Sequence, residues 1–223
     1  MLPEIQCARD IWLLVRQYGF LPLFRSRIPG FSIEDCTPPR LWFSDTEPGP
    51  WEWKGPVIRM GGCVYGKFFS GKAGYISLEW FPDFANFRRD GYDFDARWDD
   101  GLASMKDRQV YEAVADSAPI LTGDLKRRCG YGPQGNKGFE GVITRLQMQT
   151  YVVVDDFAYA KDKLGRPYGW GIAEYSTPEQ RFGDHLLEEA YRRAPGDSLR
   201  RMVTHLQSML PDAEEEQILK FLK

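Results

Sequence analysis

Apolar side chains recur every three to four residues in several segments of the chain, and this spacing places them on one face of an α-helix. The pattern predicts helices over residues 3–18 and 106–117. It is most regular over residues 139–147, where the apolar positions are Phe139, Val142, Ile143 and Leu146. Between the helices predicted over residues 106–117 and 139–147, Thr122 is a suitable N-cap for a further helix. Three successive helices are therefore expected in this part of the chain.

Residues 150–177 have the pattern of two β-strands, because β-branched and aromatic residues flank the turn sequence KDKLGRPYG. Three helices followed by a β-hairpin is the order of elements in a winged helix-turn-helix. In that fold the third helix, here residues 139–147, enters the major groove of DNA and the hairpin forms the wing.

The first hundred residues differ in that they are rich in aromatic side chains: 15 of the 32 in the chain fall between Trp42 and Trp98. Gly and Pro divide this stretch into short elements. Strand-like runs are predicted over residues 48–60 and 63–77, with turn signals at Gly61-Gly62 and Ser70-Gly71. Aromatic residues are common in the core of a small mixed domain, so a compact module is expected here.

The end of the chain is predicted to be helical. The sequence TPEQ from Thr177 is a capping box with Pro in the first turn, and it begins a helix to about residue 193. Asp197 or Ser198 is expected to cap a second helix, and the tail PDAEEEQILKFLK a short last one.

Together these elements predict an α+β fold in three parts. An aromatic-rich mixed module occupies residues 1–102, a winged helix residues 103–178, and a helical segment residues 179–223.

The composition is that of a globular chain, since 223 residues with 43% hydrophobic content can bury one sizeable core or two small ones. Charges interrupt every apolar run, so no membrane association is predicted. The start MLPEIQCARD lacks the regions of a signal peptide, and the four cysteines form no C-x-x-C pair. These features predict a cytoplasmic protein with free thiols.

Metal and cofactor chemistry find little support in the sequence. The two histidines, His185 and His205, are too few for a histidine-rich metal site. Residues 90–101, DGYDFDARWDDG, are acidic but lack the glycine and the glutamate that a calcium loop needs at fixed positions. We expect an Asp-capped, solvated loop there, although its carboxylates could also serve as a general base. No metal and no cofactor are predicted.

Charge gives a mixed indication for nucleic-acid binding. The net charge of the chain is −3, while residues 103–178 carry ten basic and nine acidic side chains. Glu140 on the third helix would repel phosphate. Basic and polar residues nevertheless gather in LKRRCG, on the exposed face of the third helix and at the hairpin tip. The expected DNA contacts are Lys126, Arg127, Arg128, Lys137, Thr144, Arg145, Lys161, Lys163 and Arg166.

The triplet Gln147-Met148-Gln149 lies where the third helix ends and the strand sequence YVVV begins. With the order of the segment from Met105 to Pro178, this triplet resembles the winged-helix DNA glycosylases of the AlkZ/YcaQ group. The resemblance implies removal of alkylated bases from DNA, including interstrand crosslinks in some members, without a metal or cofactor. Gln147 and Gln149 match the family motif of Gln, an aliphatic residue, then Gln or Asp, which is thought to position the attacking water.

A glycosylase must also extrude its target base and stack it against apolar groups. In this interpretation Trp51 and Trp53 frame the base, and Arg88 and Arg89 hold a phosphate. Other interpretations stay open: the tryptophans are core residues, and the glutamines merely end a helix. The chain is then a non-catalytic winged-helix regulator, which would be a homodimer, or a protein-interaction module. A third possibility is a small-molecule sensor that uses the aromatic zone as its pocket.

Overall fold

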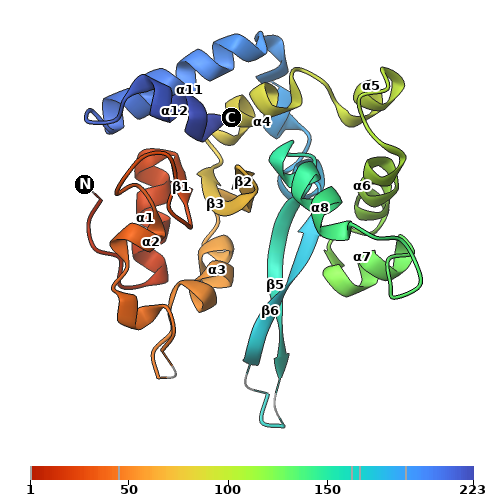
Figure 1. Ribbon diagram of the computed structural model, residues 1–223, viewed down its shortest axis with the longest axis horizontal. Coiled ribbons are helices and arrows are strands. Elements are labelled where there is room, and N and C mark those ends of the chain that lie inside the picture. Colours follow the sequence, from red (N-terminus) through yellow and green to blue (C-terminus); the bar gives the residue numbers. More distant parts are fainter. Residues whose placement is uncertain (1, 45, 162, 166, 189) are drawn as a thin grey trace.

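The computed structural model describes residues 2–44, 46–161, 163–165, 167–188 and 190–223. Within these ranges the chain is a mixed fold in which helices surround one antiparallel sheet, with strand order β1-β3-β2-β5-β6-β4 (Figure 1). The strands are β1 (Phe20–Pro22), β2 (Cys63–Phe69), β3 (Lys72–Ser77), β4 (Ile120–Leu121), β5 (Val153–Lys161) and β6 (Pro167–Ser176).

The sheet crosses the boundary that the sequence places near residue 102. Tyr65 of β2 pairs with Val154 of β5, so strands from the aromatic-rich part and from the hairpin share one sheet. The hydrophobic core is likewise continuous through both parts. The division into three domains stays a prediction, but its first two parts are joined by main-chain hydrogen bonds.

The helices before residue 102 are α1 (Ala8–Tyr18), α2 (Ile33–Cys36), the 3₁₀ turn η1 (Pro39–Leu41), α3 (Pro50–Arg59), α4 (Phe81–Arg89) and α5 (Phe94–Asp99). The β2–β3 hairpin turns at Ser70-Gly71 as predicted. The strand expected over residues 48–60 is wrong, because this segment is helix α3. Pro50 occupies the first turn of α3, and the Glu52 carboxylate accepts the main-chain N–H of Gly49 at 2.9 Å.

The middle of the chain holds α6 (Met105–Ser117), α7 (Thr122–Arg128) and α8 (Phe139–Met148), followed by the β5–β6 hairpin. The helices and hairpin predicted here are confirmed, and β4 pairs with β6. The role given to Thr122 is corrected. It is the first residue of α7 rather than its N-cap, and its hydroxyl donates to the Ala173 carbonyl at 2.8 Å.

The C-terminal part contains α9 (Pro178–Phe182), α10 (His185–Glu188), η2 (Ala190–Arg192), α11 (Pro195–Met209) and α12 (Glu215–Leu222). A continuous helix to residue 193 was expected, but Gly183 has φ +90 and interrupts it. The predicted cap of the next helix is also wrong, since α11 begins at Pro195 with Ala194 as N-cap. Figure 1 shows α11 and α12 lying across one end of the molecule, where α11 packs on α4.

The core of the aromatic-rich part is built from phenylalanine rings. Phe20, Phe68 and Phe84 are fully buried, and the ring centroids of Phe20 and Phe68 lie 6.1 and 5.9 Å from that of Phe84. The aromatic composition therefore does build a packed interior, as predicted for a compact module. None of the helices in the described ranges combines the length and apolar character that crossing a bilayer requires.

Candidate nucleic-acid interface

Helix α8 is held in place by the apolar stripe that the sequence predicts. Phe139, Val142, Ile143 and Leu146 are all buried, and α8 packs against β2 and α6. The helix ends at Met148, and Thr150 adopts a left-handed conformation with φ +62 before β5 begins. The stripe thus fixes which face of α8 is left for a ligand.

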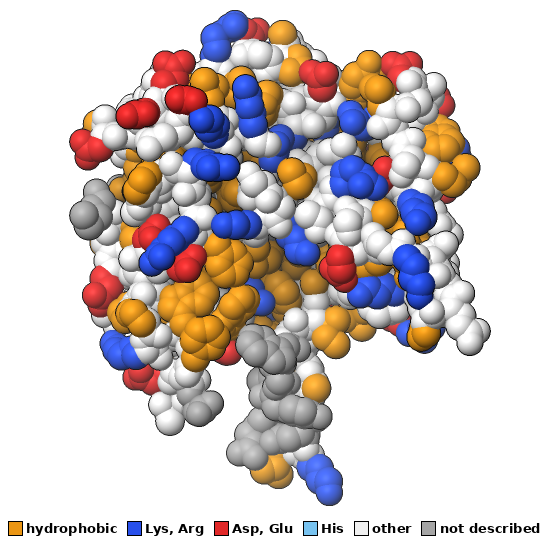
Figure 2. Space-filling view, in the orientation of Figure 1, with side chains coloured by type: hydrophobic (Ala, Val, Ile, Leu, Met, Phe, Trp, Pro, Cys, Tyr) orange, Lys and Arg blue, Asp and Glu red, His pale blue; other side chains and the backbone are white. Residues whose placement is uncertain are grey.

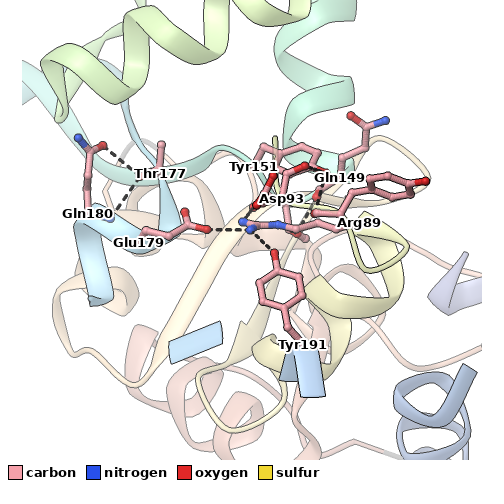
Figure 3. Close-up of polar contacts among 10 residues, drawn as sticks. Arg89, Asp93, Gln149, Tyr151, Thr177, Glu179, Gln180 and Tyr191 are labelled. Atoms are coloured by element: carbon pink, nitrogen blue, oxygen red, sulfur yellow. Dashed lines mark hydrogen bonds and ion pairs between the residues drawn. The ribbon is translucent and has the colours of Figure 1, made fainter. Parts of the chain in front are cut away.

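The two glutamines at the end of α8 have different surroundings. Gln147 is 1% exposed and both ends of its amide are used: the oxygen accepts the Lys67 main-chain N–H at 3.0 Å, and the nitrogen donates to the Ile143 carbonyl at 3.1 Å. Gln149 is half-buried and follows the last turn of the helix. Its side chain points away from the polar network around Arg89 (Figure 3). Only Gln149 therefore faces a surface hollow.

That hollow is a groove of ≈ 630 Å³ along the exposed face of α8 and its C-terminal end. Its lining includes four of the residues predicted from the sequence, namely Arg88, Thr144, Arg145 and Gln149. The remaining lining residues are Glu140, Gly141 and Met148. The structure therefore brings one glutamine, two arginines and a hydroxyl to the same groove.

Two lysines partly neutralise the acidic residue of this groove. Glu140 lies 2.9 Å from Lys126 Nζ and 3.8 Å from Lys67 Nζ, and Lys67 Nζ also donates to the Thr144 hydroxyl at 3.2 Å. The charge repulsion that Glu140 would exert on phosphate is thus reduced. Lys67 was not among the residues predicted from the sequence, because its position in a strand gives no sign that it reaches α8.

Arg145 is anchored while remaining exposed. Its Nε donates to Asp107 Oδ1 at 2.9 Å, and the Asp107 side chain is only 7% exposed. Burial by itself would raise the pKa of Asp107, but hydrogen bonds from Arg145 and Ser104 hold that pKa below its ordinary value. The pair ties α8 to the first turn of α6 and sets the direction of the Arg145 side chain.

Arg88 and Arg89, predicted as a phosphate-holding pair, point to different places. Arg88 lines the groove and donates to the main-chain carbonyls of Phe68 and Lys223. Burial lowers the pKa of Arg88 to about 10. Arg89 is 2% exposed and belongs to the interior.

Arg89 is the centre of a buried polar network (Figure 3). One guanidinium nitrogen donates to Glu179 at 2.7 Å and to the Tyr191 hydroxyl at 2.6 Å. The others bond the hydroxyl and carbonyl of Thr150 at 3.2 and 2.8 Å, and the guanidinium carbon lies 4.7 Å from the centre of the Tyr151 ring. Burial disfavours this charge, yet Glu179 and Tyr191 hold the pKa of Arg89 above its ordinary value.

The predicted cations of α7 each lie beside an acid or a ring. Lys126 pairs with Glu140 and lies 4.9 Å from the centre of the Phe139 ring. Arg127 pairs with Asp124, and Arg128 pairs with Asp116 at 2.9 Å. Exposed ion pairs contribute little to the free energy of folding, so these cations can exchange their acidic partners for phosphate at little cost.

The other predicted contacts lie at two loops. Lys137 is exposed and donates to the Pro133 carbonyl at 2.6 Å. Lys163 at the hairpin tip is exposed. Arg166 and the side chain of Lys161 lie outside the described residues.

The predicted base-framing tryptophans lie away from the glutamine groove and are themselves separated. Trp53 is 4% exposed in the core, whereas Trp51 lines a surface pocket with Phe24, Trp42 and Phe43. The sequence contains a signal for this pocket. Trp42 and Phe43 are adjacent in the polar, proline-containing stretch TPPRLWFSD, where two neighbouring aromatics cannot both be buried easily.

Within the acidic stretch over residues 90–101, where a loop was expected, residues Phe94–Asp99 form helix α5. Asp93 caps it, accepting the Ala96 main-chain N–H at 2.8 Å. Within the described part of the chain, no three His, Cys, Asp or Glu side chains form a group that would hold a metal ion.

Comparison with curated proteins and with solved structures gave no match. A family model described as AlkZ related matches residues 5–223, which is nearly the whole chain. The family resemblance predicted from the sequence is thereby confirmed: this chain belongs to the AlkZ-related family.

Proposed function

We propose that residues 105–176 form a winged helix that binds DNA, and that the chain removes alkylated bases from it. Support for the fold comes from the order α6, β4, α7, α8 and the β5–β6 hairpin, with β4 paired to β6. Membership of the AlkZ-related family supports the choice of DNA and of base excision.

In this proposal α8 lies against the DNA, and the groove beside its C-terminal end receives the damaged nucleotide. Thr144 and Arg145 contact the backbone of the duplex, and the hairpin with Lys161, Lys163 and Arg166 lies alongside as the wing. Arg88 supplies a positive charge at the other wall of the groove. Lys126, Arg127, Arg128 and Lys137 add phosphate contacts at the rim.

Gln149 is the residue that we assign to the attacking water. The observation that carries the proposal is that its side chain lines a groove shared with Arg88, Thr144 and Arg145. Its amide can hold a water molecule with its oxygen while its nitrogen contacts the substrate. Gln147 acts as a positioning residue, since its hydrogen bond to Lys67 fixes the end of α8 against β2.

The test is release of N3- or N7-alkylated purines from duplex DNA. We expect Gln149→Ala to lower the rate about 100-fold, as for loss of one positioned hydrogen-bonding group. Gln17→Ala is the matched control, because Gln17 is an exposed glutamine that, like Gln149, lies near the C-terminal end of a helix, here α1. Equal rates for wild type and Gln149→Ala would contradict the assignment.

Gln147→Ala separates the positioning role from catalysis. This change leaves the Lys67 N–H without its acceptor and opens a small cavity, so we expect a loss of about 2 kcal/mol in the free energy of unfolding. Gln149→Ala is expected to change that free energy by less than about 0.5 kcal/mol. Urea denaturation of both variants measures the difference.

A second function is favoured by one observation: only one glutamine of the triplet faces the groove, because the Gln147 amide is consumed by main-chain groups. A non-catalytic winged-helix regulator would have this arrangement. Salt-sensitive duplex binding without any base release, together with a dimer in sedimentation, would support it over the glycosylase.

A further inference from the structure

Aromatic side chains make up half of the described lining of the pocket that contains Trp51, and the lining also includes Arg25 and Glu34. The pocket measures ≈ 380 Å³, and the rings of Phe24, Trp42 and Trp51 have centroids 5.8 to 6.2 Å apart. Phe43 beside them is 84% exposed. In Figure 2 hydrophobic side chains gather in a hollow in the region of α3. An apolar patch of this kind on a surface usually marks a binding site.

A second pocket adjoins the first and is cationic. It measures ≈ 350 Å³ and shares Phe24 and Arg25 with the aromatic pocket. Its described lining contains no acidic side chain, and its basic residues are Arg25, Arg27, Lys72 and Lys220. Both volumes are in the range of about 300–1,000 Å³ that is typical of small-ligand sites.

Two of these four charges lack an acidic partner among the described residues. Arg25 pairs with Asp35 at 2.9 Å and Lys220 with Glu216 at 2.6 Å. Lys72 Nζ contacts only the main-chain carbonyl of Arg25, at 3.2 Å, and Arg27 is exposed. The pocket therefore presents uncompensated positive charge to an anion.

The cationic pocket continues toward the α8 groove. Ser70 lines the pocket, and the next residue, Gly71, faces α8 so closely that a Cβ there would lie 3.4 Å from Thr144 Cγ2 and 3.9 Å from Met148 Sδ. Thr144 and Met148 both line the groove. Groove, cationic pocket and aromatic pocket thus follow one another on one face, over which Figure 2 shows many Lys and Arg side chains.

We propose that the cationic and aromatic pockets bind an unpaired segment of single-stranded DNA. Its bases stack on Trp42 and Phe43, and its phosphates lie against Arg27 and Lys72. Phe43 is exposed and Trp42 is partly buried against Phe24 and Trp51. Accessible ring surface beside uncompensated cations is the combination that recognises single strands, because unpaired bases offer free faces for stacking. In a duplex those faces are covered. The choice of DNA as the ligand rests on the proposed function.

The experiment measures binding of a short fluorescein-labelled oligothymidylate by anisotropy, using the full chain. Wild type is expected to bind with quenching of its tryptophan fluorescence. Trp42→Ala and Phe43→Ala should each weaken binding about 5- to 100-fold, which is the effect of losing one base–aromatic stack. Met105→Ala is the matched control, because Met105 is 68% exposed at the start of α6. Thermal melting verifies that each variant is folded.

The charge contribution is measured from the salt dependence of the same binding. Arg27→Gln/Lys72→Gln should reduce the slope of log affinity against log salt by about 1.4, the value for two contacts to a single strand. Arg192→Gln/Arg200→Gln, at two exposed arginines near α11, is the matched control and should leave the slope unchanged.

The outcomes distinguish this proposal from the proposed function. Release of alkylated bases without any oligothymidylate binding would overturn the single-strand site and leave the glycosylase in place. Oligothymidylate binding that depends on Trp42 and Arg27, without base release, would support the site and not the enzyme. Equal binding by all variants would overturn the site, as would a wild-type dimer that Phe43→Ala dissociates, since a second copy would then cover the rings.

Discussion

Arg88 and Arg89 are neighbours on α4, yet they belong to two regions that use polar groups in opposite ways. In the interior behind α4, Arg89 is saturated by Glu179, Tyr191 and Thr150. On the outer face the groove and the two pockets hold cations without an acidic side-chain partner among the described residues, such as Arg88, which donates to main-chain carbonyls, and Lys72.

The same interior contains a second saturated charge on α4. Asp83 is 3% exposed and accepts hydrogen bonds from Arg193 at 2.9 Å, Ser198 at 2.7 Å and Arg201 at 3.1 Å. These bonds attach α11 and the chain before it to the rest of the fold. Saturated buried charges therefore determine architecture, while incompletely paired surface charges are free to meet a ligand.

The largest effect is expected from removing the charge at the centre of the interior network. Arg89→Met leaves Glu179, Tyr191 and the Thr150 carbonyl without their donor, and we expect a loss of about 3 kcal/mol in the free energy of unfolding. Urea denaturation measures it. Arg200→Met, at an exposed arginine of α11, is the control and should cost less than about 0.5 kcal/mol. Equal losses of unfolding free energy in the two variants would show that the buried network stabilises the fold no more than an exposed arginine does.

An intermediate effect is expected at Asp107, where a nearly buried carboxylate holds a groove residue. Its folded-state pKa is below its ordinary value of 3.8, so the unfolded chain binds a proton more readily. The contribution of the ionised Asp107 to the free energy of unfolding is fully present above pH 3.8 and is lost as the pH falls through the folded-state pKa. Asp107→Asn should remove this acid-dependent part, at a cost near neutral pH of about 1 kcal/mol.

Unfolding measured by urea at several pH values between neutral and strongly acidic tests this expectation. Asp116→Asn serves as the control, because Asp116 is 65% exposed in its pair with Arg128. A stability profile of Asp107→Asn that keeps the full acid dependence of the wild type would show that the Asp107–Arg145 pair does not link α6 to α8 energetically.

Periodicity predicted the elements of this chain well where one face alone is buried. The stripe of α8 and the arms of the β5–β6 hairpin were found in this way. Periodicity did not predict the correct element where a local contact determines the secondary structure. The capping box at Gly49 and Glu52 makes α3 a helix despite Pro56, and Gly183 ends α9 early. Such contacts depend on two or three residues and leave no periodic pattern.

The candidate site was predictable in part. Four of the candidate residues, Arg88, Thr144, Arg145 and Gln149, line one groove, although the sequence assigned them to separate roles. The sequence could not show which residue of a neighbouring pair is buried and which is exposed, because burial depends on partners that are distant in the chain. Thr150 and Glu179 lie 61 and 90 positions from Arg89 and draw it inward, and Lys67 lies 80 positions from Gln147. Sequence composition cannot show which of two arginines or glutamines finds such a partner.

The smallest effect should sharpen the comparison from the side of the outer face. Glu140 neutralises Lys67 and Lys126 beside the groove, so Glu140→Gln frees two positive charges for phosphate. We expect duplex binding to strengthen about 2- to 10-fold and the salt slope to steepen by about one to two. Stability should hardly change, because these pairs are exposed. Anisotropy over a salt series measures both, with Glu112→Gln on α6 as the control for an exposed, arginine-paired glutamate. Weaker binding by Glu140→Gln would mean that the exposed face of α8 does not contact the DNA backbone. The incompletely paired surface charges would then have no role in DNA binding, although they differ from the fully paired charges of the interior.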